Sequence, residues 1–232
     1  MINRVVKDRG LFFSYKLDLT RNIQSNIARA RDHPGDPLVK DLVNLFPNSV
    51  DYIPKFCFNH TLLEEYSDKQ YAPFRTPCIY GYIAMQKVSP MMDFTLITRK
   101  DCRRPGRRFI TRGLDADGAA ANFSEQEHVF CVRGYQNNAL TVASHLQIRG
   151  SIPLIWSMKP NLAWAPPVIV NSNFDESFQA AKLHFKETNA SYQKQYLINL
   201  IDKKGSQLKI GNKFTEIIQH LNDPALNYVY FD

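Results

Sequence analysis

The chain lacks the cysteine spacings that bind metal or form redox pairs. Its four cysteines stand at positions 57, 78, 102 and 131, with no C-x-x-C pair and no zinc-type cluster of histidine and cysteine. Such wide and irregular spacing also argues against a disulfide framework, so we expect a reducing compartment. We therefore predict neither a structural metal nor a cofactor.

Long apolar runs are missing as well. No stretch approaches the ~20 apolar residues of a membrane-spanning helix, and the N-terminus, MINRVVKDRG, lacks the apolar core of a secretion signal. The sequence shows no internal repeat and no low-complexity tract. We expect a cytoplasmic protein without a transmembrane segment, whose contact with membranes is peripheral.

What the chain does have is enough apolar residues for a core and a surplus of positive charge. Hydrophobic residues make up 44% of the 232 residues and aromatic residues 12%, which is an ordinary globular composition. Lysine and arginine outnumber aspartate and glutamate by 29 to 22, a net charge of +7. This balance favours an anionic partner: nucleic acid, a phosphate ester or an acidic membrane face.

Apolar patterns predict strands along most of the chain and helices near both ends. Thr20 is predicted to cap a helix that runs to about Arg31, where HPGDP (33–37) ends it. Alternating or continuous apolar segments predict strands at 78–88, 92–100, 128–134, 140–150, 151–157, 167–171, 195–201 and 227–232.

From residue 167 onward the strands alternate with amphipathic helices. Asn173 is predicted to begin the first helix, since Glu176 follows three residues later. Apolar side chains at helical spacing are Phe174, Phe178, Ala181 and Phe185 in the first helix and Phe214, Ile217, Ile218 and Leu221 in the second. This alternation predicts an α/β fold with a mixed, largely parallel sheet and flanking helices. Ligands of such sheets bind beyond the carboxyl ends of the strands.

The stretch from Arg99 to Arg112 is strongly basic. It holds seven basic residues, six of them arginine, the side chain suited to two-point contact with phosphate. The plain alternative is a solvated surface, as for most runs of like charge. A nucleic-acid surface is a further alternative. Because Phe109 is the one aromatic residue in the stretch, there is no platform for base stacking, and we predict no nucleic-acid partner.

Cys102 and Arg108 have the C-x5-R spacing of the cysteine-dependent phosphatases. In those enzymes a loop wraps backbone N–H groups around the phosphate and leads into a helix that faces the anion. Here Pro105 removes one N–H donor, and Phe109 stands where serine or threonine usually follows the arginine. Neighbouring arginines lower the pKa of a thiol, so reactivity stays open, but we do not expect Cys102 to be the nucleophile.

Several segments resemble the Sac domain, the phosphoinositide phosphatase domain also found in the synaptojanins. They are FFSYKLDLTRNIQ (12–24), FCFNHTLLEE (56–65), RRPGRRFITRGLDADGAAANFSEQE (103–127), LQIRGSIPLIWS (146–157) and YVYFD (228–232). The third is the most specific, being similar to the family's R-A-G-T-R-Y-x-x-R-G-x-D-x-x-G-x-x-A-N-F-x-E-T-E block. The segments follow one another in the family's order over nearly the whole chain.

The resemblance implies an internal part of that domain. The family's catalytic signature, R-x-N-C-x-D-C-L-D-R-T-N, does not occur in the sequence, and Cys102 stands where the family block typically has arginine. We expect residues 1–55 to be the end of the Sac N-terminal subdomain and 56–232 the first part of the catalytic subdomain. The nucleophile is then expected downstream, and the chain by itself is expected to be inactive.

The function that the resemblance implies is hydrolysis of phosphomonoesters of phosphatidylinositol phosphates through a cysteine nucleophile, without metal. The partner is then a phosphoinositide headgroup at a membrane surface, facing the cytosolic side of endomembranes. One alternative is a non-catalytic module that binds a protein partner, or acidic lipid through Arg99–Arg112. Another is an incomplete chain that does not fold alone.

The resemblance also supplies candidate site residues, although it implies no catalytic residue within this chain. The candidates for binding substrate phosphate are the family-matched arginines Arg104, Arg108, Arg112 and Arg149. The alternative is that arginines of this set form ion pairs that hold the fold, with Asp115, Asp117, Glu125 or Glu127 as partners. The residues expected to build a turn or support the site are Asp115, Gly118, Asn122 and Glu127.

Overall fold

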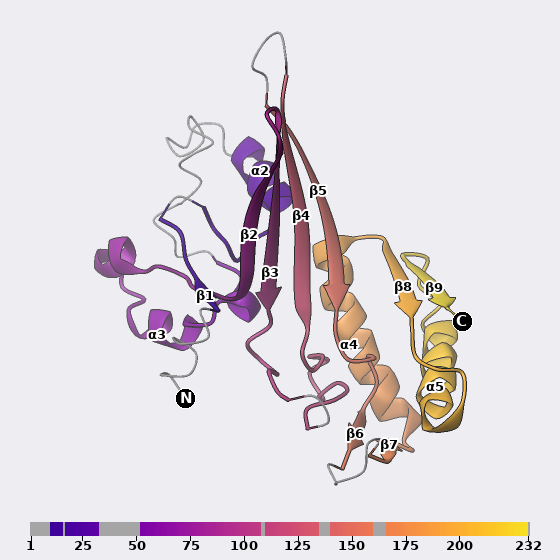
Figure 1. Ribbon diagram of the computed structural model, residues 1–232. Helices are drawn as coiled ribbons and strands as arrows, with labels where there is room; N and C mark the ends of the chain where they lie inside the picture. Colours follow the sequence, from indigo (N-terminus) through magenta and orange to yellow (C-terminus); the bar gives the residue numbers. More distant parts are fainter. Residues whose placement is uncertain are drawn as a thin grey trace. The chain divides into compact units, whose positions relative to one another are not determined.

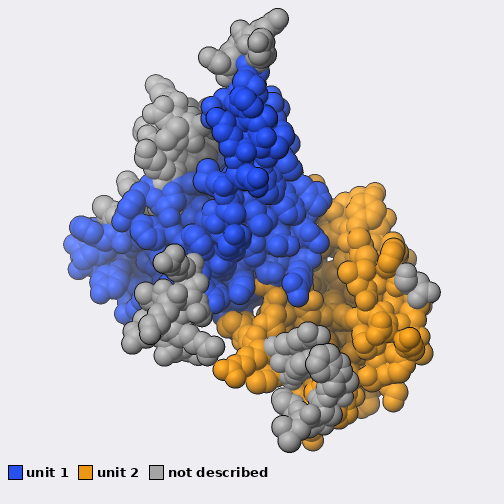
Figure 2. All heavy atoms as spheres, in the orientation of Figure 1, with its two compact units in different colours: residues 1–103, 124–149 blue, residues 104–123, 150–232 orange. Residues whose placement is uncertain are grey.

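The computed structural model describes residues 10–15, 17–32, 52–107, 110–134, 140–159 and 166–231 (Figure 1). Contacts divide the chain into two compact units (Figure 2). Unit 1 comprises residues 1–103 and 124–149, and unit 2 comprises residues 104–123 and 150–232. This division does not test the subdomain boundary predicted after residue 55, which stays a prediction.

Unit 1 is built on a five-stranded antiparallel sheet in the order β1-β2-β3-β4-β5. Its strands are β1 (Leu11–Phe12), β2 (Ile79–Ser89), β3 (Met92–Lys100), β4 (Ser124–Arg133) and β5 (Leu140–Arg149). Only Pro90 and Met91 separate β2 from β3, and a connection this short permits antiparallel pairing alone. The segment containing Leu19 covers one face of the sheet, where Leu19, Ile79 and Ile97 are buried together.

A helix capped by Thr20 would begin at residue 21, but helix α2 (Ile23–Asp32) begins two residues later. The side chain of Asn22 accepts a hydrogen bond from the backbone N–H of Ser25 at 2.8 Å, so Asn22 caps the helix. Thr20 instead donates to Asp18 Oδ1 at 2.6 Å and accepts from the N–H of Ile53 at 2.9 Å. The predicted Thr20 cap is therefore wrong, because a nearby carboxylate and a distant backbone donor occupy its hydroxyl.

The rest of unit 1 contains the short helix α3 (His60–Glu65) and the 3-10 helices Pro54–Phe56 and Lys69–Phe74. Asn59 fastens this region to the start of the sheet. Its Nδ2 donates to the carbonyl of Thr76 at 2.9 Å, and its Oδ1 accepts from the N–H of Cys78 at 2.8 Å.

Unit 2 contains the helices and strands of the C-terminal part of the chain. They are β6 (Trp156–Met158), β7 (Val168–Val170), α4 (Phe174–Tyr192), β8 (Gln195–Asn199), α5 (Gly205–Leu221) and β9 (Leu226–Tyr230). The predicted Asn173 cap is confirmed, since its side chain accepts from the N–H of Glu176 at 3.3 Å. Phe185 of α4 and both Phe214 and Ile217 of α5 are buried, as their helical spacing predicts.

The α/β class is confirmed, but the sheet is not largely parallel. The five-stranded sheet is antiparallel, and among the described strands only β8 and β9 pair in parallel. β7 pairs antiparallel with β6 rather than lying beside β8. The periodicity identified β7, α4, β8, α5 and β9 correctly, but it does not determine which strands become neighbours. None of the described helices has both the length and the apolar character of a membrane span.

Candidate functional site

The basic stretch begins in the interior of unit 1, where Arg99 is fully buried. Its guanidinium donates to Glu125 Oε1 at 2.9 Å and to Glu127 Oε2 at 2.8 Å. It also donates to the backbone carbonyls of Leu19 and Arg21. A buried charge is tolerated when it is both paired and hydrogen-bonded, and Arg99 meets both conditions. Arg99 therefore holds the fold and is not available to a ligand.

Glu127 extends this network to the start of helix α2. Its Oε1 accepts from the N–H of Ile23, the first residue of α2, at 2.7 Å, and from the hydroxyl of Ser144 on β5 at 2.8 Å. The first N–H groups of a helix have no partner within the helix, and a carboxylate there is favoured by the helix dipole. Glu127 thus connects β3, β4, β5 and α2 through one buried side chain.

Treating Arg99 as part of a basic surface was wrong, although the sequence contains a signal for its burial. Arg99 lies two positions after Ile97 in a strand, so both side chains point to the same face. Glu125 and Glu127 show the same two-residue alternation, and Arg99 stands directly opposite Glu125 in the β3–β4 register. An arginine on the apolar face of one strand, together with alternating glutamates on a later strand, is a signal for a buried ion pair, although the register that joins them is not visible in the sequence.

Cys102 follows this network and is held by unit 1. Its N–H donates to the carbonyl of Lys55 at 2.8 Å, and its Sγ lies 3.5 Å from the carbonyl oxygen of Pro54. Burial raises the pKa of the Cys102 thiol, and the Asp101 carboxylate adds to that rise. The neighbouring Arg103 opposes the rise, but burial is the larger effect. Cys102 is therefore a thiol at neutral pH. Arg108 lies outside the described residues.

Arg104 belongs to unit 2 and organises the loop that follows it. One Nη atom donates to the carbonyls of Gly113 at 2.9 Å and Ala119 at 3.1 Å, and the other donates to the carbonyl of Arg112 at 3.2 Å. Its Nε lies 3.8 Å from Asp115 Oδ2. The guanidinium therefore faces the backbone of the 112–119 segment, where it satisfies three carbonyl oxygens.

Asp115 and Gly118 form a tight turn within this segment. Asp115 Oδ1 accepts from the N–H groups of Asp117 at 3.2 Å and Ala119 at 2.8 Å. Gly118 has a φ of +79°, and a Cβ there would lie 2.6 Å from the backbone nitrogen of His184 and 2.9 Å from the carbonyl oxygen of Ala180. Both neighbours belong to α4, so the turn packs against this helix with no room for a side chain.

Asn122 closes the loop at its other end. Its Oδ1 accepts from the N–H of Gly106 at 3.1 Å, while its Nδ2 lies 3.3 Å from the carbonyl of Thr111. Its own N–H donates to the carbonyl of Arg104 at 3.1 Å. Asn122 has a φ of +55°, a conformation that asparagine tolerates better than most residues. The segment from Arg104 to Asn122 is thus a hydrogen-bonded scaffold.

The four predicted phosphate-binding arginines are placed differently. Arg104 and Arg112 share the loop just described, and the Arg112 guanidinium lies over the ring of Trp156, 5.5 Å from its centroid. Arg149 ends β5 in unit 1, where it is exposed and pairs in register with Ser124. Among the described residues, no group of three or more histidine, cysteine, aspartate or glutamate side chains is suited to hold a metal ion.

A profile of the SacI homology domain matches residues 1–232. The chain belongs to the SacI homology domain family. This SacI homology chain is 32% identical to phosphatidylinositol-3-phosphatase SAC1 of Saccharomyces cerevisiae, over 98% of the chain and 35% of the relative. It is 33% identical to SAC1-B of Danio rerio, over 100% of the chain and 37% of the relative.

A plant protein gives a third comparison. The identity to phosphoinositide phosphatase SAC7 of Arabidopsis thaliana is 28%, over 97% of the chain and 36% of the relative. The SacI homology chain thus spans little more than a third of the length of these relatives. The resemblance to the Sac domain is confirmed at the level of the family.

Proposed function

We propose that this SacI homology chain is part of an enzyme that hydrolyses phosphomonoesters of phosphatidylinositol phosphates. The observation that carries the proposal is the match along the whole chain to relatives named as phosphatidylinositol-3-phosphatases and phosphoinositide phosphatases. The net charge of +7 suits an anionic substrate. The cytosolic surface of endomembranes, where such lipids are accessible, is the proposed place of action.

The proposed reaction uses a cysteine that is not among these 232 residues. A thiolate attacks phosphorus, the inositol oxygen leaves with a proton, and water then hydrolyses the S–P bond to release phosphate. Cys102 has the one C-x5-R spacing in the sequence, but burial raises the pKa of its thiol. A group that stays protonated is a poor nucleophile, so we assign no catalytic role to Cys102.

The arginines divide into two proposed roles. Arg104 supports the loop, because its donors face three backbone carbonyls. Arg108, Arg112 and Arg149 each remain a candidate for contact with a phosphate group of the substrate. Asp115, Gly118 and Asn122 support Arg112 by fixing the conformation of the loop, and Glu127 supports the sheet on which Arg149 lies.

The test uses the full-length protein that contains this chain. We expect it to release inorganic phosphate from soluble short-chain phosphatidylinositol 3-phosphate, and Arg112→Ala or Arg149→Ala to lower kcat/KM roughly tenfold through loss of a charge-assisted contact. Arg107→Ala is the matched control, since Arg107 is an exposed arginine of the same basic stretch. Absence of phosphate release from every phosphatidylinositol phosphate would favour a non-catalytic binding module instead.

A further inference from the structure

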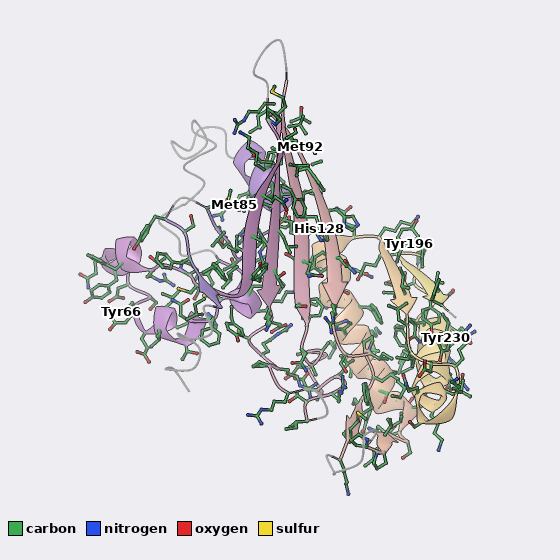
Figure 3. All side chains as sticks on the ribbon, in the orientation of Figure 1. Tyr66, Met85, Met92, His128, Tyr196 and Tyr230 are labelled. Carbon is green, nitrogen blue, oxygen red and sulfur yellow. The ribbon has the colours of Figure 1, made fainter. Side chains whose placement is uncertain are left out.

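The two hairpins of the unit 1 sheet end in a projecting tip. We define the hairpin tip as residues 85–93 of β2 and β3, 130–133 of β4 and 140–142 of β5. The cross-strand register is continuous here, with Met92 opposite Val132 and Val132 opposite Thr141. Figure 1 shows these strand ends reaching past helix α2, and Figure 3 shows Met85 and Met92 on the β2–β3 hairpin.

The hairpin tip exposes large apolar side chains on both faces. The exposed fractions are 78% for Met85, 51% for Val88, 38% for Phe130, 40% for Val132, 56% for Leu140 and 36% for Val142. Because side chains alternate along a strand, Met85, Leu140 and Val142 lie on one face and Phe130 and Val132 on the other. An incomplete core would expose apolar side chains on one face of the sheet, whereas the hairpin tip exposes them on both faces.

The charges of the hairpin tip are few and unequal. Its three charged side chains are Lys87, Asp93 and Arg133. The exposed Arg133 donates to Oδ2 of the partly buried Asp93 at 3.2 Å, and the two charges offset each other. Lys87 is exposed and leaves the tip with a charge of +1. Among the described tip residues, Asp93 is the one carboxylate, so little opposes approach to an anionic surface.

We propose that the hairpin tip inserts into the interfacial region of a membrane that contains anionic lipid. A lipid interface surrounds a projecting tip and takes up apolar groups from both of its faces, whereas a protein surface usually covers one face. Lys87 favours anionic headgroups by simple attraction. Insertion stays shallow and involves the side chains nearest the turns, such as Val132 and Leu140, because the outer edges of β2 and β5 carry backbone groups that need water or headgroups as partners. The inference does not depend on the proposed phosphatase chemistry.

The test is co-sedimentation of the 232-residue chain with vesicles of phosphatidylcholine and phosphatidylserine. The double variant Val132→Asp, Leu140→Asp should lower vesicle partitioning at least roughly tenfold, as one apolar side chain on each face loses its lipid contact. Leu62→Asp is the matched control, because Leu62 is 60% exposed on α3 of the same unit. This control should bind within about twofold of the wild type, since its side chain lies outside the tip. Wild-type binding should largely survive ~0.5 M salt, which screens Lys87 but not apolar contact.

A second variant distinguishes a loss of membrane binding from misfolding of the double variant. Val88→Trp places an indole at an exposed tip position, and its emission should shift to shorter wavelength and be quenched by brominated lipid in vesicles. Wild-type chain that stays in the supernatant, or a Val88→Trp indole that lipid does not quench, would overturn the proposal. It is also overturned if the wild type is a dimer that the double variant converts to a monomer, since the tip is then a contact between copies. Phosphate release from soluble substrate is unaffected by these outcomes.

Discussion

Arg99 and Arg104 stand five positions apart in one basic stretch, yet the two units use them in different ways. In unit 1, Arg99 is fully buried and neutralised by two glutamates. In unit 2, Arg104 is partly exposed and donates to three neutral carbonyl oxygens of its own loop. The comparison teaches that a count of positive charges does not measure how many cations are available to an anionic ligand.

Removing Arg99 and removing Arg104 should also change the free energy of unfolding by different amounts. Removal of Arg99 leaves two carboxylates without their cation in the interior, where charge is poorly solvated. Removal of Arg104 leaves neutral carbonyls near the surface, where water can replace the guanidinium. The same type of substitution should therefore have a large effect in unit 1 and a moderate effect in unit 2.

Arg99→Met is the change with the largest expected effect. It should lower the free energy of unfolding by about 3–5 kcal/mol, the range for breaking a buried ion pair. Chemical denaturation of the wild type and the variant measures this difference. The triple variant Arg99→Met, Glu125→Gln, Glu127→Gln is the control, and it should recover part of the loss because no unpaired carboxylate remains. A loss below about 1 kcal/mol for the single variant would mean that the network is not stabilising.

Gly118→Ala tests the scaffold of unit 2 and should have the next largest effect. The new Cβ meets α4 backbone atoms at 2.6 and 2.9 Å, and the φ of +79° adds backbone strain. We expect a loss of about 2–3 kcal/mol from strain and overpacking together, measured by thermal unfolding.

Gly205→Ala is the matched control for that substitution. Gly205 has a φ of +60° with nothing within 4 Å of the new Cβ, so the loss should be limited to about 1 kcal/mol of backbone strain. Equal losses at the two glycines would contradict the packing of the turn against α4.

Arg104→Met should have a smaller effect than Arg99→Met, of about 1–2 kcal/mol, because the carbonyls it leaves are neutral and near water. Amide hydrogen exchange should show faster exchange across residues 112–119 and little change in the unit 1 sheet. Faster exchange in β3 and β4 instead would contradict the division of roles between the two arginines.

The buried Cys57 thiol of unit 1 gives the smallest expected effect, which appears only at alkaline pH. Burial raises the pKa of the Cys57 thiol from 9.0 to about 12. The folded state thus favours the neutral thiol, and this stability is present below pH 9 and is lost as pH rises towards 12. We expect the advantage of the wild type over Cys57→Ala in unfolding free energy to shrink across this window. A constant difference would contradict the burial of the thiol.

Elements with local signals were predicted well from the sequence. The Asn173 cap and the apolar spacing of α4 and α5 depend on residues within a few positions of one another, and the structure has them as predicted. The strands β2 and β3 were likewise visible from their apolar alternation. The parallel sheet was wrong because strand neighbours are chosen by long-range packing, on which a local period carries no information.

The candidate site was less predictable for the same reason. The hydroxyl of Thr20 is occupied by Asp18 and by the N–H of Ile53, a donor far along the chain. The partners of Arg99 lie 26 and 28 positions away and become adjacent only through the β3–β4 register. The turn of Asp115 was expected from its residue types, whereas its packing against α4 at Gly118 depends on a helix some sixty positions further on.

The most direct test of the account is phosphate release from short-chain phosphatidylinositol 3-phosphate by the purified 232-residue chain and its Cys102→Ser variant. In this account the Cys102 thiol, the one cysteine with C-x5-R spacing, stays protonated at neutral pH because burial raises its pKa. We therefore predict no release above the blank from either protein, and the same unfolding curve within about 0.5 kcal/mol. Release by the wild type that Cys102→Ser abolishes would contradict the account and make Cys102 the nucleophile.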